Sequence, residues 1–506
     1  MVLAIFFLSL ALASGTTVWD RDEARFATAA LEMTRTGNLL VPTLNGELRA
    51  QKPILPYWVM AASMRVAGAT ATAARLGSCL GLALAAAFTG WLGWRLVSPR
   101  AGLLAAAILA TTPLALLEGA AATADALLLA FVTGAVAVGV LSGSWLGLSL
   151  LLGLALLTKG PVGLVLPILI LAFARPAEKR RLFIASILGL AIFALWFVPA
   201  NQATQGRFLA IGLGHEVVTR VAQPLEGHGG RFLLSLPYYV PVVLVGFLPF
   251  TLYLPAALAA LRGSAQRRLL LAWIAVPFVL FTLVATKLPH YVLPIWPAFA
   301  LAVAALLDRE RRGELSPDDR RWLRRGLFLY LPLAALAVAV LGVLAWHLPW
   351  PGLAAPLVTL GGLGAASALT ASILHVRGRF TRAAHVLVAG SASMALVAGL
   401  WLGPRVEVLK PVPRLVAAIR RAVPEAPPTA TFGFGEPSLG FLLGGQPLKH
   451  LQTRAQAEAW LGGPGPRLLV TTRALALPSA REVASAAGPN LSKGEWVELV
   501  ALVRDP

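Results

Sequence analysis

The chain has 506 residues, of which 58% are hydrophobic and 13% are charged, and its mean hydropathy is +0.75. A soluble domain carries about a quarter charged residues, so this composition excludes a soluble protein and indicates that lipid surrounds most of the chain. The net charge of +20 reflects topology in a membrane protein, and we exclude nucleic acid as a partner. The single cysteine, Cys79, excludes a disulfide framework and a thiolate metal site.

The first eighteen residues are apolar and predict an uncleaved membrane helix, because they have no basic start and further membrane segments follow. The stretch WDRDEARFAT, residues 19–28, then places five charged side chains in six positions. Residues 23–35 predict an amphipathic helix on the outer surface, with Asp22 at its N-cap and Gly37 at its C-terminal end.

Apolar runs of roughly 17 to 25 residues can span a bilayer. Fourteen candidate runs lie near residues 1–18, 57–78, 80–95, 101–118, 125–141, 145–158, 161–174, 183–200, 235–261, 269–285, 291–307, 326–346, 353–374 and 384–402. The runs 57–78 and 80–95 cannot both span, because the next basic loop must lie on the opposite side from Asp22. Merging them predicts about thirteen transmembrane helices, with the extra length forming a surface helix.

With thirteen spans, basic clusters fall in alternate loops. They are Arg95 and Arg100; Arg175, Lys179, Arg180 and Arg181; Arg262, Arg267 and Arg268; seven arginines from Arg309 to Arg325; and Arg377, Arg379 and Arg382. The positive-inside rule places these five loops in the cytoplasm. The first charged stretch is then extracytoplasmic, together with Asp22, Lys52, Glu118, Asp125, Lys159, residues 215–228, Lys287 and His290. Ionisable groups at the outer ends of membrane helices are functional candidates.

The last hundred residues lose the membrane character. Short apolar runs, such as residues 430–434 and 467–472, alternate there with Pro and Gly clusters. We predict a transmembrane domain over residues 1–404 and a small extracytoplasmic α/β domain over residues 405–506.

Five outward-facing stretches carry a family resemblance. They are DRDEARFATAALEMTRTGNLLVPTLNG with QKPILPYW, TADALLLAF, LLTKGPVGLVLP, HEVVTR and TKLPHYVLPIWPAFA. Together they resemble the polyprenyl-phosphate-sugar-dependent glycosyltransferases typified by the aminoarabinose lipid A transferases and related to protein O-mannosyltransferases. The resemblance covers residues 18 to about 300.

The resemblance implies that Asp22 and Asp125 are the catalytic-site carboxylates and that Lys52 and Arg220 hold the phosphate of the lipid-linked donor. A departing polyprenyl phosphate needs fixed cations, which is physically consistent with this assignment. A hydroxyl acceptor would pass its proton to a carboxylate, whereas a phosphate acceptor needs no base. The family mechanism implies inversion at the anomeric carbon.

One position departs from the family pattern. Members commonly have Glu before the Lys-Pro pair, and in aminoarabinose transferases this Glu belongs to a zinc site, but here the residue is Gln51. Gln is a poor zinc ligand. His215, Glu216 and His228 remain metal candidates, with histidines meeting headgroups or substrate as the favoured alternative, so no cofactor is predicted with certainty.

Further cavity candidates each have a structural alternative. Lys159 neutralises Asp125 or marks the membrane interface, and Lys287 and His290 contact the donor phosphate or extend to the headgroups. Arg25 and Tyr57 complete this set, and Glu118 is read as a helix-end residue. Taken alone, Asp22 is better explained as a helix cap.

A transporter is the main rival from another class, but carriers usually show internal repeats and charges near the midplane. A scaffold that only presents the tail domain does not need Asp22, Lys52, Asp125 and Arg220 on one side. We therefore expect a bacterial inner-membrane enzyme that moves a sugar from a polyprenyl-phosphate donor to lipid A or another envelope glycoconjugate. The alternative acceptor is a protein, as in O-mannosyltransferases.

Overall fold

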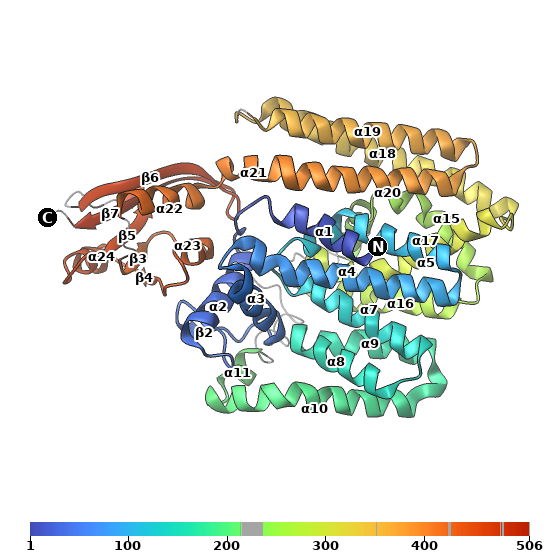
Figure 1. The fold of residues 1–506 in the computed structure, drawn as a ribbon, viewed down its shortest axis with the longest axis horizontal. Coiled ribbons are helices and arrows are strands. Elements are labelled where there is room, and N and C mark those ends of the chain that lie inside the picture. Colours follow the sequence, from blue (N-terminus) through green and yellow to red (C-terminus); the bar gives the residue numbers. More distant parts are fainter. Residues whose placement is uncertain are drawn as a thin grey trace.

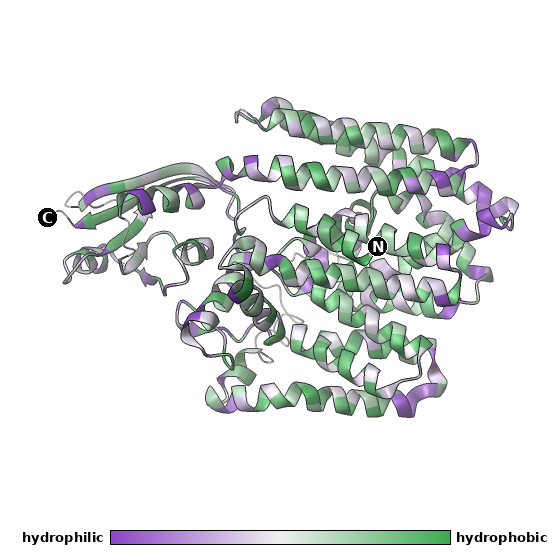
Figure 2. Ribbon diagram, viewed as in Figure 1, coloured by the Kyte–Doolittle hydropathy of each residue, from purple (hydrophilic) through white to green (hydrophobic). Residues whose placement is uncertain are grey.

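A computed structural model describes residues 1–212, 214, 236–350, 352–423, 427–475, 477 and 480–504. Long helices lie side by side through most of the molecule, and a smaller part containing a β-sheet lies at one end of them (Figure 1). Hydrophobic residues predominate along the helices, whereas hydrophilic residues gather in the loops at the opposite end and in the sheet-containing part (Figure 2).

The membrane part is built from fifteen described helices. They are α1 (Val2–Ala13), α4 (Ala71–Leu96), α5 (Pro99–Thr111), α6 (Pro113–Gly119), α7 (Asp125–Leu141), α8 (Trp145–Lys159), α9 (Pro161–Ala174), α10 (Lys179–Ala203), α14 (Tyr239–Gly246), α15 (Leu254–Ala260), α16 (Arg267–Leu283), α17 (Trp296–Arg311), α18 (Pro317–His347), α19 (Ala354–Val376) and α20 (Phe380–Leu396). The 3₁₀ turn η6 (Pro289–Ile295) leads into α17, and the π-helix η7 (Val397–Leu402) continues α20.

Six helices among the described residues are long and apolar enough to cross a membrane. The number becomes eight if two bent pairs, α5 with α6 and α14 with α15, each count as one span. Shorter apolar helices include α1, α7, α8 and α9. The predicted polytopic helical fold is confirmed, while the number of thirteen spans stays a prediction.

The break between α5 and α6 has a local cause. Pro113 cannot donate a backbone hydrogen bond, and it disfavours helical geometry at the residue before it. Thr112 accordingly has an extended backbone, with ψ of 144°. The two helices are bent by 71°, and this bend sets the direction of α6, which carries Glu118.

A cap of short elements covers one end of the helices: α2 (Asp22–Thr36), β1 (Thr43–Leu44), β2 (Glu47–Leu48), α3 (Leu55–Ala67) and α11 (Arg207–Leu209). As predicted, α2 ends at Gly37, which has a φ of 73°. Two predictions about α2 were wrong. Asp22 is the first helical residue rather than the N-cap, and residues 26–33 are fully buried between neighbouring elements instead of lying on a surface.

The C-terminal part contains a mixed five-stranded sheet. Its elements are α21 (Gly403–Val406), α22 (Pro411–Ala422), β3 (Thr429–Phe432), α23 (Pro437–Leu442), β4 (Lys449–Leu451), α24 (Arg454–Leu461), β5 (Leu468–Thr472), β6 (Ala480–Asn490) and β7 (Glu495–Arg504). The strand order is β4-β3-β5-β7-β6, parallel around β3 and antiparallel around β7. Separate apolar clusters involve α22 and α24. The small sheet domain is confirmed, and its start at residue 405 stays a prediction.

The five basic loops meet at the end of the helices away from this sheet. In the loop after α15, the Gln266 side chain donates a hydrogen bond to the carbonyl of Leu96 at 2.9 Å. Arg268, at the start of α16, donates to the carbonyl of Phe173 at 2.7 Å. Arg312 reaches the carbonyl of Val97 at 3.2 Å. Those predicted charged candidates that the structure describes gather at the other end, beside the cap and the sheet.

Candidate functional site

A buried ion pair joins two neighbouring membrane helices at the cap. Asp125 is the first residue of α7 and Lys159 is the last residue of α8, and Lys159 Nζ lies 2.5 Å from Asp125 Oδ1. The two side chains are only 10% and 13% exposed. The Lys159 ammonium also lies over the Tyr291 ring, 5.1 Å from its centre. Of the two interpretations left open for Lys159, its contacts match the one in which it neutralises Asp125.

Glu118 and His290 extend this pair into a cluster of four charged or titratable side chains. His290 Nε2 lies 3.9 Å from Asp125 Oδ2, and its Nδ1 lies 3.6 Å from Glu118 Oε1. Glu118 also accepts a hydrogen bond from Thr123, at 3.0 Å. The sequence interpretation of Glu118 as a helix-end residue missed this position. A carboxylate inside an apolar run was the available signal.

Asp22 and Lys52 approach the cluster from the cap. Asp22 is 62% exposed and lies 3.5 Å from the Arg25 guanidinium. The charges of both Asp22 and Lys52 act electrostatically on His290. Asp22 also acts on Glu118, and Lys52 on Asp125. The described candidates from four separate segments therefore share one region.

Beside the cluster lies a cavity of about 140 Å³ whose wall combines cations with aromatic rings. Lys52 and Lys159 supply the charge, and Gln51 presents a buried carbonyl oxygen that has no hydrogen-bond partner among the described residues. The remaining wall is largely apolar and includes Phe193, Trp196, Phe197, Phe208, Phe281 and Tyr291. Such a surface fits a ligand with an anionic head and a long apolar tail.

Two other candidates occupy different surroundings. Tyr57 is fully buried in the cap, where its ring stacks on Phe26 and its hydroxyl accepts a hydrogen bond from Arg49 at 2.9 Å. The Lys287 ammonium donates to the carbonyls of Phe281, Thr282 and Val284 at the end of α16. Neither side chain lines the cavity, so their predicted contact with substrate gains no support from these positions.

Four predicted site residues lie outside the described residues: His215, Glu216, Arg220 and His228. Their roles stay predictions.

An ion pair that the sequence analysis missed connects the two carboxylate-bearing segments. Glu23 makes two short contacts with Arg75 of α4, at 2.6 and 2.7 Å, and both side chains are almost fully buried. The same carboxylate accepts from the backbone of Trp19 at 2.8 Å and of Ala122 at 2.7 Å. The Glu23 carboxylate thereby links the segment just before Asp22 to the turn before Asp125. An arginine inside an apolar helix was the signal.

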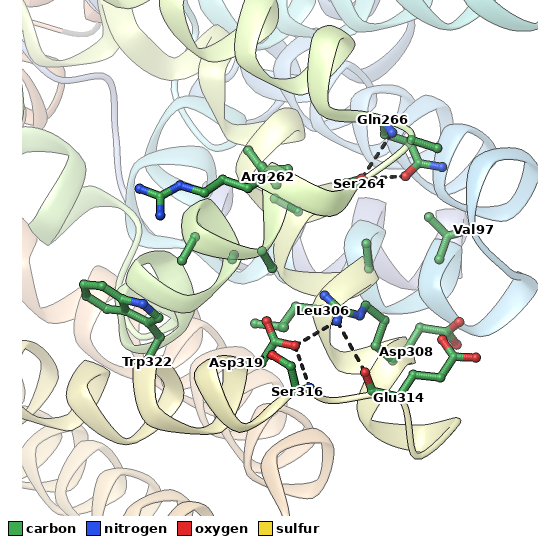
Figure 3. A pocket seen from close by; sticks show the side chains of 18 of the residues that line it. Val97, Arg262, Ser264, Gln266, Leu306, Asp308, Glu314, Ser316, Asp319 and Trp322 are labelled. Atoms are coloured by element: carbon green, nitrogen blue, oxygen red, sulfur yellow. Dashed lines mark hydrogen bonds and ion pairs between the residues drawn. The ribbon is translucent and has the colours of Figure 1, made fainter.

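A larger hollow of about 720 Å³ lies at the basic end of the helices, away from the cap. Figure 3 shows Arg262 and Trp322 on one side of it, and Val97 and Gln266 on the other. Its buried acids are paired within the protein: Asp319 with Arg309, at 2.8 Å, and Asp308 with nearby arginines. Among the described residues, none of the predicted site residues lines this hollow.

A metal ion could be held by Glu118, Asp125 and His290, whose ligand atoms lie within 4.8 Å of one another. Carboxylate and imidazole are suitable ligands for zinc. The fit is incomplete, however, because the Lys159 ammonium already contacts Asp125 and would repel a second cation at this oxygen. No cofactor is therefore assigned.

The fold and the site define an integral membrane protein in which clustered acids and cations lie beside a largely apolar cavity. The family model of dolichyl-phosphate-mannose-protein mannosyltransferases matches residues 51–200. The undecaprenyl phosphate-α-4-amino-4-deoxy-L-arabinose arabinosyl transferase of Pectobacterium carotovorum is 30% identical over 381 residues, which are 70% of this chain and 66% of the relative. The corresponding Edwardsiella ictaluri protein is also 30% identical, over 66% of this chain and 62% of its own length.

The fold agrees with a solved structure over nearly its whole length. ArnT from Cupriavidus metallidurans, bound to undecaprenyl phosphate, superimposes with a TM-score of 0.82 at 22% identity and covers 99% of this chain and 96% of its own. The chain spans less than two thirds of the length of the curated relatives it matches. It belongs to the family of polyprenyl-phosphate-dependent glycosyltransferases that includes these aminoarabinose transferases.

Proposed function

We propose that the protein transfers a sugar from a polyprenyl-phosphate carrier to lipid A or another cell-envelope glycoconjugate. The observation that carries this proposal is the cavity in which Lys52 and Lys159 face aromatic side chains, beside the carboxylates of Asp125 and Glu118. The cations suit a phosphate head and the apolar wall suits an isoprenoid tail. Undecaprenyl phosphate is bound by the structural neighbour from Cupriavidus metallidurans.

In the proposed reaction, an acceptor oxygen forms a bond to the anomeric carbon while the bond between that carbon and the phosphate oxygen breaks. Lys52 and Arg220 stabilise the phosphate that leaves on the carrier. A hydroxyl acceptor gives its proton to Asp22 or Asp125, and a phosphate acceptor needs no such transfer. A single displacement inverts the anomeric configuration.

The acceptor has one specific alternative. The family model that matches residues 51–200 is named for transferases acting on protein, which favours a protein hydroxyl as the second candidate. Lipid A is the first choice because the curated relatives compared above are named as aminoarabinose transferases.

The proposed topology has thirteen spans in a bacterial inner membrane. The five basic loops would be cytoplasmic by the positive-inside rule, and the cap, the site and the sheet domain would be extracytoplasmic. The tail would begin near residue 405.

A second proposal is that turnover needs no divalent metal at Glu118, Asp125 and His290, although their ligand atoms lie close enough to hold one. The protein would be treated with a chelator and its metal content measured by mass spectrometry. We expect turnover to survive chelation, because Lys159 already supplies a positive charge at Asp125. Loss of turnover that returns with added zinc would establish the metal instead.

The main experiment uses purified protein in detergent with radiolabelled polyprenyl-phosphate sugars of several kinds, and it measures free polyprenyl phosphate. The wild type should release carrier, and Asp22→Asn should lose turnover while expression and thermal stability persist. Glu47→Gln, at an exposed acid of the same cap, is the matched control and should behave as wild type. Equal turnover in Asp22→Asn would remove Asp22 from the mechanism.

A further inference from the structure

The strip between α1 and α2, residues 14–21, is held from two sides. On the membrane side, Arg75 donates to the carbonyls of Ala13, Thr16 and Thr17. On the other side, Thr17 donates from its backbone and its hydroxyl to Glu407, at 2.9 and 2.8 Å. Asp22 follows directly after this strip, so its position depends on both sets of contacts.

Asp20 makes the direct connection to the sheet domain. Its Oδ1 accepts from the backbone N–H of Ser438 at 2.8 Å, and its Oδ2 accepts from the Ser438 hydroxyl at 2.6 Å. Ser438 is 2% exposed. Hydrogen bonds to an ionised acceptor are stronger than neutral ones, and both oxygens of one carboxylate meet a single residue. The contact therefore holds Asp20 in one orientation relative to Ser438, which an ion pair between distant charges would not do.

Arg21 and Lys410 reinforce the same junction. Arg21 Nε lies 3.7 Å from Glu436, a buried residue two positions before Ser438 in the chain. Lys410 donates to the Thr17 carbonyl at 2.9 Å and lies 3.7 Å from the centre of the Trp19 ring.

The rest of α2 also rests on the sheet domain. Thr28 donates to the carbonyl of Pro437 at 3.3 Å, and Arg35 donates to the carbonyl of Gly444 at 2.5 Å. Phe441 of α23 joins the apolar core beneath α2. Gly445 has a φ of 72°, and a side chain there would collide with Leu31. The helix that begins with Asp22 is thus fixed along its length by the C-terminal domain.

We propose that the C-terminal domain is a positioning element for the catalytic site, and that the Asp20–Ser438 contact sets the place of Asp22. The proposal rests on the proposed function, in which Asp22 takes part in transfer. Asp20 and Ser438 are positioning residues, because they act on Asp22 through the backbone of the strip and the first turn of α2.

The contact also carries a pH signature. Burial raises the pKa of Asp20 to about 6, the two Ser438 hydrogen bonds oppose this, and Glu436 adds to it while Lys410 lowers it. Glu407 faces Lys410 at 3.0 Å. Because its pKa is higher in the folded protein, Asp20 binds more protons in the folded than in the unfolded state. Its contribution to the free energy of unfolding is therefore greatest at low pH and falls as the pH rises from about 4 to about 6. Asp20→Asn should flatten this fall.

The test measures kcat, donor KM and hydrogen–deuterium exchange in the full-length protein. Asp20→Ala and Ser438→Ala should lower kcat about tenfold, which corresponds to about 1.4 kcal/mol of activation free energy, with little change in donor KM. Exchange in residues 19–28 should rise. Asp20→Asn and Ser438→Thr keep the hydrogen-bonding groups and should retain most of the wild-type kcat at neutral pH.

Arg473→Ala removes an exposed ion pair elsewhere in the sheet domain and is the matched control. Wild-type kcat and unchanged exchange in both alanine variants would overturn the proposal. If Asp20→Ala does not fold, the kcat and exchange of Ser438→Ala test the proposal alone, because this variant removes only a hydroxyl. An inactive wild type with every donor would refute the proposed function instead, while the exchange measurement would still judge the contact.

Discussion

Two lysines at the same end of the membrane helices have different contacts. Lys159 pairs with a carboxylate at the cavity wall, whereas Lys287 satisfies backbone carbonyls at the end of α16. The sequence treated both as cavity candidates, because a lysine near a helix end has the same appearance in either role. Only their partners distinguish them.

The two roles predict different outcomes. Lys159→Met should lower kcat about 10²–10³-fold, as expected for loss of a fixed charge at a reacting centre. Lys287→Met should instead lower thermal stability, by about 1–3 kcal/mol for unsatisfied buried carbonyls, with kcat per folded molecule close to wild type. Turnover assays and thermal unfolding in detergent separate the two. Wild-type kcat in Lys159→Met would make its ion pair purely structural.

Glu23 and Arg75 give a stability prediction. Glu23→Gln leaves the buried Arg75 guanidinium without its counter-ion, and we expect a loss of about 3–5 kcal/mol, measured by thermal or denaturant unfolding. Asp318→Asn breaks an exposed pair with Arg321 and serves as control, since such pairs contribute roughly 0–1 kcal/mol. A Glu23→Gln protein as stable as this control would contradict the assigned role of the pair.

At the level of single residues, the sequence indicated which ionisable side chains are candidates better than it indicated which side chains they contact. Asp125, Lys159 and His290 were singled out because charge is costly in lipid, and the structure brings them together. Glu118 was undervalued, and Arg75 was missed, because their importance comes from contacts with segments far away in the chain. Periodicity and composition contain no information on such contacts.

At the level of elements, breaks were harder to predict than helices. Hydropathy located the apolar segments, yet it did not show the turn between α5 and α6, which follows from Pro113. The burial of α2 depends instead on what packs beside it. The prediction that α2 lies on a surface was wrong because α23 covers it. An amphipathic pattern shows which face of a helix is apolar, but it does not show whether another element covers the polar face.

The contact between α1 and η7 gives a prediction at this scale. A Cβ on Gly399 would collide with the backbone of Ala11, and a Cβ on Gly15 would collide with the carbonyl of Gly399. Gly399→Ala should therefore destabilise the protein by about 1–3 kcal/mol through overpacking. Gly362→Ala in α19, where nothing lies within 4 Å of the added atom, is the control and should not lose stability. Equal melting temperatures would contradict the close approach.

For the whole molecule, the charge pattern of the loops predicted which ends of the helices lie together. Hydrogen bonds among the basic loops place them at one end, and the charged candidates lie at the other. The side of the membrane that each end faces is a prediction from the positive-inside rule. The docking of the sheet domain on α2 could not be foreseen, since it depends on the complementary shapes of two parts.

Cysteine labelling tests this orientation, because the only natural cysteine is buried. In a Cys79→Ala background, Lys493→Cys in the sheet domain should react with a membrane-impermeant maleimide in intact spheroplasts. Arg320→Cys, in the exposed first turn of α18, should react only after permeabilisation. Labelling of both positions in intact cells, or the reverse pattern, would overturn the proposed topology.

The pairing of Thr17 with Glu407 joins positions 390 residues apart. A ribosome making this chain therefore releases the strip before Asp22 long before its second anchor exists. Until α20 and the segment after it are inserted, the first helix has neighbours on one side only, and the reaction centre is unfinished. Under the proposed function, competence for transfer therefore arises late in biosynthesis, after almost all of the membrane helices are in place.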